Sequence, residues 1–365
     1  MQPLSPVSGH WTSRIHRGPG ATWERAEADL DQACRPVPLP SRAVWARHLR
    51  HAHAWLVSAH DSAGRCDAAL AVEVEPTRAL PGHRLLRAHH LGSALVGDAG
   101  DVVLSALRDL SVSAPRILRV NLEFILRTPA EHERVGRTLR TLGFRRLDEG
   151  RNYRDTLVIG LGGSEEDVLR SFSTTTRRDL RHWSDGPVTL RPIVDARYAD
   201  RLNAISRETF ARTGGDWEPR PWPERIRLGI ERPELSRLVG LFREGRDDPE
   251  SLLAYAWGCV HGDFAHYDDA GSTRAEDIRV SMAYPLMWDL VRWARRGGCA
   301  WFDMGGVTDG TTESGDPRGG ISDFKRRFSK EVAAVGAEWE FEPHPRRARL
   351  ARGLRQAAAV LGTRR

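Results

Sequence analysis

The sequence predicts a mixed α/β protein built from two similar domains, and two observations lead to this prediction. The chain has 365 residues, more than one hydrophobic core usually supports. Its two halves, residues 54–161 and 252–341, also show the same order of expected elements. Each half runs through a hairpin, a helix, a buried strand, a second helix and a long final strand. We interpret this order as a duplicated α/β unit around a mixed sheet.

Local patterns justify the elements of the first half. Short apolar runs bounded by turn residues indicate strands, and apolar residues at helical spacing indicate helices. Gly143 marks the end of a helix, because glycine is the commonest residue just past a helix C-terminus. In chain order we expect a helix over 22–33, strands over 54–59 and 69–74, a helix over 101–110, a strand over 116–124, a helix over 131–142 and a strand over 152–161.

The second half is expected to open with one long helix after Gly162-Gly163-Ser164. Acidic residues occupy its first turn, where the helix dipole favours them. Its apolar stripe consists of Leu169, Phe172, Thr176, Leu180 and Trp183. After it we expect a strand over 188–193, a helix over 196–212, a hairpin over 252–260 and 263–267, a helix from Pro285 to Gly297, a strand over 300–304, a loop over 305–319, a helix over 321–328, a closing strand over 331–341 and a basic helix from Pro343.

These elements suggest four parts of the chain. Residues 1–40 form an N-terminal extension that is partly disordered, because its start is polar and rich in Pro and Gly. Residues 41–161 form the first domain, and residues 162–342 form the second domain with the catalytic site. Residues 343–365 form a basic C-terminal helix or tail.

Composition narrows the class of protein. Hydrophobic residues make up 40% and charged residues 28%, as is usual for a soluble globular protein. No apolar run is long enough to span a membrane, and no secretory signal is visible, so we expect a cytoplasmic protein. The net charge of +6 is compatible with a polyanionic partner. Only two of the 55 basic residues are lysines, Lys325 and Lys330, which draws attention to both.

Two segments resemble a known family. Trp301–Gly306 reads WFDMGG, and after a loop rich in Asp, Glu and Gly comes Gly320-Ile321-x-x-Phe324-Lys325-x-x-Phe328. This stretch resembles the Fem aminoacyltransferases of peptidoglycan bridges, and residues 152–158 resemble the junction between that family's two domains. The resemblance covers roughly residues 40–342. It implies two tandem GNAT-like domains with mixed sheets that transfer an amino acid from aminoacyl-tRNA to an amine acceptor. It also implies that no metal and no cofactor takes part; we expect a monomer.

Lys325 and Phe324 are the candidate catalytic residues. An aminoacyl ester is already activated, so what helps its attack by an amine is positioning and a positive group where the oxyanion develops. Lys325 suits that task, and we expect it at the N-terminus of the helix over 321–328. The resemblance implies that the Phe-Lys pair stabilises the reacting aminoacyl end. The alternative is a solvated lysine beside a core phenylalanine. No general base stands out.

Four residues are candidates for substrate binding: Arg220, Tyr267, Asp303 and Gly305. The resemblance implies that Arg220 grips the diphosphate of a cell-wall precursor, a task that suits a guanidinium. Four residues on, where the family usually has tyrosine, stands Glu224, and an acid beside a phosphate is unfavourable. An amine-bearing small molecule, as in antibiotic assembly, is therefore an alternative acceptor to the cell-wall precursor. Tyr267 has cross-strand packing as its alternative role.

Arginines near the reaction centre are candidates for contacts with tRNA phosphates. They are Arg326 and Arg327, which follow Lys325 directly, and Arg178 and Arg181 on the first helix of the second half. Such clusters are also common on solvated surfaces, and that alternative stays open.

Two other functions compete with tRNA-dependent transfer. One is a GNAT-like N-acyltransferase that takes its acyl group from coenzyme A or a carrier protein. Residues 295–300, RRGGCA, match the pattern of a coenzyme A loop, but a helix is expected to end there and a strand to begin, the reverse of a phosphate-binding turn. The other is a non-enzymatic RNA-binding module. His48, His51 and His53 lack a matching ligand set, so no metal site is expected.

Overall fold

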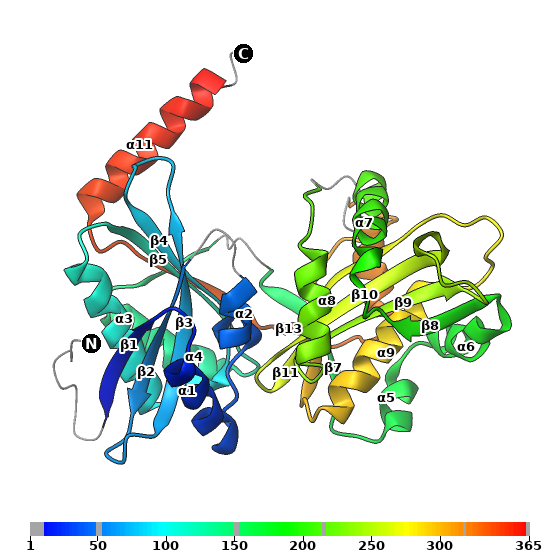
Figure 1. Ribbon diagram of the computed structural model, residues 1–365, viewed down its shortest axis with the longest axis horizontal. Coiled ribbons are helices and arrows are strands. Elements are labelled where there is room, and N and C mark those ends of the chain that lie inside the picture. Colours follow the sequence, from blue (N-terminus) through cyan, green and yellow to red (C-terminus); the bar gives the residue numbers. More distant parts are fainter. Residues whose placement is uncertain (1–10, 49–52, 149–152, 214–216, 317–318, 363–365) are drawn as a thin grey trace. The chain divides into compact units, whose positions relative to one another are not determined.

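The protein is described by a computed structural model that covers residues 11–48, 53–148, 153–213, 217–316 and 319–362. The chain forms two compact units (Figure 1). Unit 1 comprises Met1–Asn152 together with Val335–Arg365, and unit 2 comprises Tyr153–Ala334. Within the described residues, each unit contains one seven-stranded mixed sheet. The predicted fold class, two α/β domains with mixed sheets, is confirmed.

The sheet of unit 1 has the order β1-β2-β3-β4-β5-β14-β6. Its neighbouring strands pair antiparallel except β4 and β5, which are parallel. The register of β4 with β5 shifts between Arg84 and Leu85 and again between Ala88 and Leu91. The strands are β1 (Thr12–Arg17), β2 (His53–His60), β3 (Cys66–Pro76), β4 (Arg84–Leu91), β5 (Ile117–Ile125), β6 (Arg145–Arg146) and β14 (Gly336–Phe341).

Helices cover both faces of this sheet, because successive strand residues point to opposite sides. On β3, Leu70 and Val72 join the core cluster that contains residues of α3 and α4. Ala69 and Ala71 join a second cluster, with Trp23 of α1. The helices of unit 1 are α1 (Ala21–Gln32), α2 (Ala43–His48), α3 (Asp98–Ser113), α4 (Pro129–Thr141) and α11 (Pro345–Gly362).

The sheet of unit 2 has the order β13-β7-β12-β11-β10-β9-β8. Its pairs are antiparallel except β11 and β12, which run parallel. The strands are β7 (Asp155–Gly160), β8 (Val188–Pro192), β9 (Ser236–Arg243), β10 (Leu252–His261), β11 (Phe264–Ser272), β12 (Trp301–Gly306) and β13 (Val332–Ala334).

Unit 2 is also covered on both faces. Ala254 and Ala256 of β10 join a cluster with α5, α6 and α9, whereas Tyr255 between them meets Trp222 of α8 edge-on, with ring centroids 4.9 Å apart. The helices are α5 (Glu165–Ser171), α6 (Thr174–His182), α7 (Ala199–Thr213), α8 (Trp222–Glu231), α9 (Ala283–Arg296) and α10 (Gly319–Arg326). Short 3-10 turns span Leu39–Ser41, Ser93–Leu95, Trp183–Asp185, Ala196–Tyr198 and Pro249–Ser251.

The final strand of each half lies in the sheet of the other half. β7 pairs with β12 in unit 2, and β14 pairs with β5 in unit 1. The strand expected over 331–341 is in fact two strands, β13 and β14, in different sheets. The units therefore divide at 152/153 and 334/335, and not at the expected 161/162 and 342/343. β1 and α1 also belong to unit 1, so the part of the expected extension from residue 11 onward is ordered.

The long helix expected after Gly163 is two helices. α5 ends at Ser171, and Ser173 begins α6 by accepting a hydrogen bond from the Thr176 backbone N–H at 3.2 Å. A serine side chain that caps a new helix competes with continuation of the old one. Phe172, at the break, packs edge-on against Trp288 and Phe328. The break thus turns an apolar side chain into the core.

Gly100 offers a test of packing in unit 1. A Cβ at this position in α3 would lie 2.0 Å from the Leu95 carbonyl oxygen. We expect Gly100→Ala to lower the free energy of unfolding by about 1–3 kcal/mol, because backbone must move to admit the methyl group. Gly353→Ala, where a Cβ meets nothing within 4 Å, is the control and is expected to raise it by up to about 1 kcal/mol. Denaturant titration of both variants measures the difference; stabilisation by both would contradict this packing.

Candidate acyl-transfer site

The site lies where two parallel strands of unit 2 part. β11 and β12 pair only over Phe264–His266 and Trp301–Asp303. Beyond these pairs β11 contains a bulge: Trp257 of β10 faces Asp269 and Gly258 faces Tyr267, so Asp268 is the extra residue. A bulge bends its strand and re-aims side chains. The register of β12 with β7 shifts at the same level, between Asp303 and Gly306.

Asp303 is the hub of this region. One oxygen of its carboxylate accepts a hydrogen bond from the Tyr153 hydroxyl at 2.7 Å. The other accepts hydrogen bonds from the Gly305 backbone N–H at 2.7 Å and from the Thr156 hydroxyl. The side chain is wholly buried. Gly305 adopts a φ of +75°, which favours glycine. Asp303 and Gly305, both expected to bind substrate, thus shape the end of β12.

Lys325 reaches the same strand end from α10. Its ammonium donates a hydrogen bond to the Gly306 carbonyl at 2.7 Å and lies 5.9 Å from the centroid of the Tyr267 ring. A Cβ on Gly305 would sit 3.2 Å from the Lys325 Nζ, so glycine leaves room for the ammonium. The residue is only 6% exposed. The structure brings together Lys325, Tyr267, Asp303 and Gly305, all four of them expected site residues.

The expected position of Lys325 in its helix was wrong. α10 begins at Gly319, so Lys325 lies in its last turn and not at its N-terminus. Helix N-terminal amides therefore do not assist it, whereas the negative end of the helix dipole favours its positive charge. Burial lowers the pKa of Lys325 to about 8, and the nearby Asp303 charge opposes that shift. At neutral pH the side chain is mostly a desolvated cation.

Phe324 is part of an aromatic group that fixes α10. Its ring stacks on Tyr284 of α9, with centroids 5.7 Å apart, and meets Phe328 edge-on at 5.2 Å. Phe328 is wholly buried, whereas Phe324 is partly buried. The adjacent Lys325 is thereby held by a rigid helix end.

Arg220 lies in a charge network that the sequence did not reveal. Its Nε is 3.4 Å from the Asp269 carboxylate, which also binds Arg225 at 3.2 Å and accepts a hydrogen bond from the Tyr255 hydroxyl at 3.0 Å. Arg225 lies 3.8 Å from Asp268 and stacks over the Trp257 ring at 3.9 Å. The two acidic residues inside a strand, Asp268 and Asp269, were the available signal.

The four arginines expected to bind tRNA all make contacts within the protein. Arg326 donates to the carbonyl oxygens of Thr308 and Gly310 and pairs with Asp323, so it holds the loop before α10. Arg327 donates to the Tyr284 hydroxyl at 3.0 Å. On α6, Arg178 lies 3.4 Å from Asp179, and Arg181 donates to the Arg177 carbonyl at 3.3 Å.

The match at residues 295–300 is a helix end, as expected. α9 ends at Arg296, the backbone N–H of Gly297 bonds back to the Trp293 carbonyl, and Gly298 has a φ of +81°. β12 starts at Trp301. The order is helix then strand, so these glycines do not present helix N-terminal amides to a phosphate.

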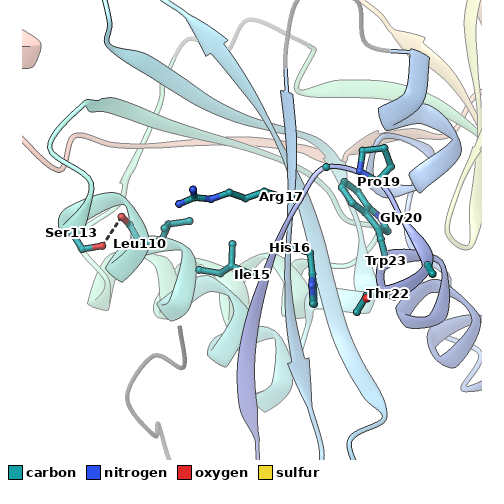
Figure 2. Close-up of a pocket in the computed structure, with 11 residues that line it drawn as sticks. Ile15, His16, Arg17, Pro19, Gly20, Thr22, Trp23, Leu110 and Ser113 are labelled. Atoms are coloured by element: carbon teal, nitrogen blue, oxygen red, sulfur yellow. Dashed lines mark hydrogen bonds between the residues drawn. The ribbon is translucent and has the colours of Figure 1, made fainter. Parts of the chain in front are cut away.

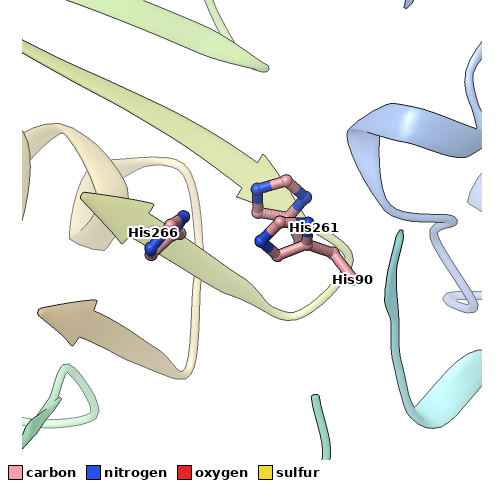
Figure 3. Close-up of side chains that lie close together, drawn as sticks. All are labelled: His90, His261 and His266. Atoms are coloured by element: carbon pink, nitrogen blue, oxygen red, sulfur yellow. The ribbon is translucent and has the colours of Figure 1, made fainter. Parts of the chain in front are cut away.

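His266 adjoins the site: its Nε2 would lie 3.6 Å from a Cβ on Gly305, and its ring centroid is 6.0 Å from that of Tyr153. Figure 3 shows His261 and His266 on the β10–β11 hairpin, with ring centroids 6.0 Å apart, and His90, which belongs to β4 of unit 1. Among His48, His51 and His53, the histidines not expected to bind a metal, His51 lies outside the described residues. A cavity of about 690 Å³ in unit 1, between β1, the start of α1 and α3, contains no expected site residue (Figure 2).

Comparisons with known proteins concern the fold. A sequence profile of the acetyltransferase (GNAT) domain matches residues 170–326. The crystal structure of FemX is similar, with a TM-score of 0.69 and 14% identity over 90% of this chain and 97% of that chain. The chain has the FemX fold. The structure of L-PGS from Bacillus licheniformis is also similar, with a TM-score of 0.51 and 12% identity over 95% of this chain and 98% of that one. No curated protein sequence matches.

The FemX fold agrees with the two-domain architecture predicted from the sequence. The match to the acetyltransferase (GNAT) domain spans α6 to α10, and this segment includes β11, β12 and Lys325. None of the helices in the described residues is both long and apolar enough to cross a bilayer.

Unfolding measurements test whether Asp303 holds several parts of this region together. We expect Asp303→Asn to lower the free energy of unfolding by about 2–3 kcal/mol. The amide has one acceptor oxygen where the carboxylate has two, so at least one buried donor loses its partner. Tyr153→Phe removes one donor and leaves the carboxylate with the others, so we expect a loss of about 1 kcal/mol. Urea unfolding at pH 7 measures both. Equal losses in the two variants would show that Asp303 is no hub.

Proposed function

We propose that unit 2 transfers an amino acid from aminoacyl-tRNA to an amine acceptor and forms an amide bond. The observation that carries this proposal is the buried ammonium of Lys325, held by the Gly306 carbonyl where β11 and β12 part. A positive charge in a water-poor setting is most effective where negative charge develops during a reaction. The GNAT profile match and the FemX fold support acyl transfer as the class of reaction.

The chemistry needs one charge to be stabilised and one proton to move. The acceptor nitrogen attacks the ester carbonyl carbon, and the negative charge on the carbonyl oxygen is stabilised by the Lys325 ammonium. The ester C–O bond then breaks, and the proton lost by the amine passes to the departing ribose oxygen of the tRNA. Because the ester is already activated, positioning and this cation supply most of what the protein contributes.

The acceptor is proposed to be an amine-bearing small molecule without a diphosphate. Arg220 and Arg225 are balanced by Asp268 and Asp269 in the same network, so no net positive charge is left for a diphosphate. Glu224, in the first turn of α8, adds a further negative charge. This arrangement favours a role in small-molecule assembly, such as antibiotic biosynthesis, over peptidoglycan bridge formation. Use of aminoacyl-tRNA would place the protein in the cytoplasm.

A coenzyme A-dependent N-acyltransferase is the second candidate. The match to the acetyltransferase (GNAT) domain over residues 170–326 favours it. Against it, the segment 295–300 that resembles a coenzyme A loop is a helix end. A non-enzymatic RNA-binding module would leave the buried lysine unexplained.

An assay with charged tRNA tests the proposal. Purified protein is incubated with a pool of radiolabelled aminoacyl-tRNA and either small-molecule amines or a UDP-linked peptide acceptor. We expect amide products with the small amines, and none after ribonuclease treatment. Lys325→Met is expected to lower the rate by about 100-fold, the usual effect of losing an oxyanion-stabilising group. Lys330→Met removes the other lysine, which is exposed, and serves as the matched control.

Three outcomes would contradict the proposal. Product formation that survives ribonuclease and requires acyl-coenzyme A would establish the second candidate. Equal rates for the two lysine variants would remove Lys325 from the reaction. Preference for the UDP-linked acceptor would show that Arg220 is released from Asp269 to bind a diphosphate.

A further inference from the structure

The C-terminal helix α11 carries an unusual concentration of charge. Over Pro345–Gly362 it contains five arginines and no acidic residue. Figure 1 shows this helix running outward from unit 1. Its charge is not explained by the proposed reaction, whose residues belong to unit 2.

Only one side of α11 is used for packing. Ala348 and Ala351 are buried, at 3% and 2% exposure. Successive helix residues are about 100° apart, so Arg346, Arg349 and Leu350 fall together on the opposite side. These three are exposed, Leu350 by 56%. The outward face of α11 is therefore largely open to solvent along its described side chains.

The charge on this face is uncompensated. Arg352 pairs with Glu342 on the inner side. Among the described residues, no carboxylate lies within ion-pair distance of Arg346 or Arg349. The same holds for Arg355, which follows Ala351 by one turn on the same side of the helix but is exposed. This contrasts with Arg220, Arg225 and Arg326 of unit 2, each of which is paired with an aspartate. Uncompensated guanidinium groups are available to an anionic partner.

A cavity adjoins the face. It has a volume of about 440 Å³. Arg347 donates to the Pro115 carbonyl, which holds its side chain at the cavity, and Arg116 contributes a second guanidinium that is unpaired in the described structure. The lining combines cationic with apolar groups: Leu80, His83, Pro115, Arg116, Arg347 and Leu350.

We propose that the outward face of α11 and this cavity, together called the α11 surface, bind the phosphate–ribose backbone of RNA. The unpaired arginines of this surface are complementary in charge to RNA phosphates. A cavity lined by guanidinium and apolar groups suits a backbone in which phosphates alternate with sugars. An interfacial membrane helix instead needs a broad apolar face, whereas arginines and leucines share this side of α11. The choice of tRNA as the RNA rests on the proposed function; the RNA-binding surface itself does not.

The test measures binding of deacylated tRNA to the full-length protein by fluorescence anisotropy at several salt concentrations. We expect the triple variant Arg346→Gln/Arg349→Gln/Arg355→Gln to weaken binding by about 10–100-fold at low salt and to reduce the slope of log K against log salt by about 2, because each lost phosphate contact removes about 0.7–0.9. No described carboxylate pairs with these three side chains, so the variant should fold normally.

A control variant removes the same charge elsewhere in unit 1. Arg65→Gln/Arg108→Gln/Arg137→Gln replaces three arginines that are paired with acids. We expect it to change tRNA affinity by less than about 3-fold, because paired guanidiniums release few counterions. Equal weakening by the two triples would overturn the proposal, since charge alone would then explain binding. Unchanged tRNA binding by the α11 triple, with lost binding to phosphatidylglycerol vesicles, would overturn it in favour of a membrane.

The outcome is separable from that of the amide-forming assay. Deacylated tRNA cannot react, so its binding is measured apart from the amide-forming step. Loss of tRNA binding in the α11 triple therefore supports the surface even if no amide forms. Amide formation with wild-type tRNA affinity in the α11 triple would support the proposed function and overturn the surface.

Discussion

The hydrogen bond from Lys325 to the Gly306 carbonyl is the contact on which the site depends. It is possible because Asp303 fixes the turn of β12 at Gly305, and because the aromatic group around Phe324 fixes the end of α10. The parting of β11 and β12 after a short parallel pairing leaves the strand end available to the ammonium. The same short segment therefore forms the end of β12 and holds the candidate catalytic cation. The negative charge of Asp303 offsets part of the cost of burying the Lys325 ammonium.

Charge balance separates the two kinds of arginine in this protein. Arg220 and Arg225 both pair with Asp269, which stabilises unit 2 and lowers its attraction for phosphates. On α11 the guanidiniums of Arg346, Arg349 and Arg355 have none in the described part of the chain. An arginine-rich sequence therefore does not by itself locate an anion site, because pairing decides which arginines are free to bind.

Much of the fold was predictable because it follows from local patterns. The strands around 54–59 and 300–304 and the helix that ends at Gly297 are set by apolar runs and capping residues. The exchange of β7 and β14 between sheets was not predictable, since it depends on pairing between residues far apart in sequence. Lys325 was misplaced within α10 because Gly319 and Gly320, weak helix formers, nevertheless begin the helix. The motif located Lys325, Asp303 and Gly305 together, whereas the partner of Arg220 became visible only in the structure.

The most direct test of the central claim is the pKa of Lys325. Because the chain has only two lysines, labelling with ¹³Cε-lysine gives two NMR signals, and the one absent from Lys325→Met identifies Lys325. Burial is expected to make this signal titrate near pH 8. Since the folded pKa is then below the unfolded value, stability should also rise with pH between about 8 and 10.4. A Lys325 signal that titrates near pH 10.4, the ordinary lysine value, would show a solvated side chain and contradict the site described above.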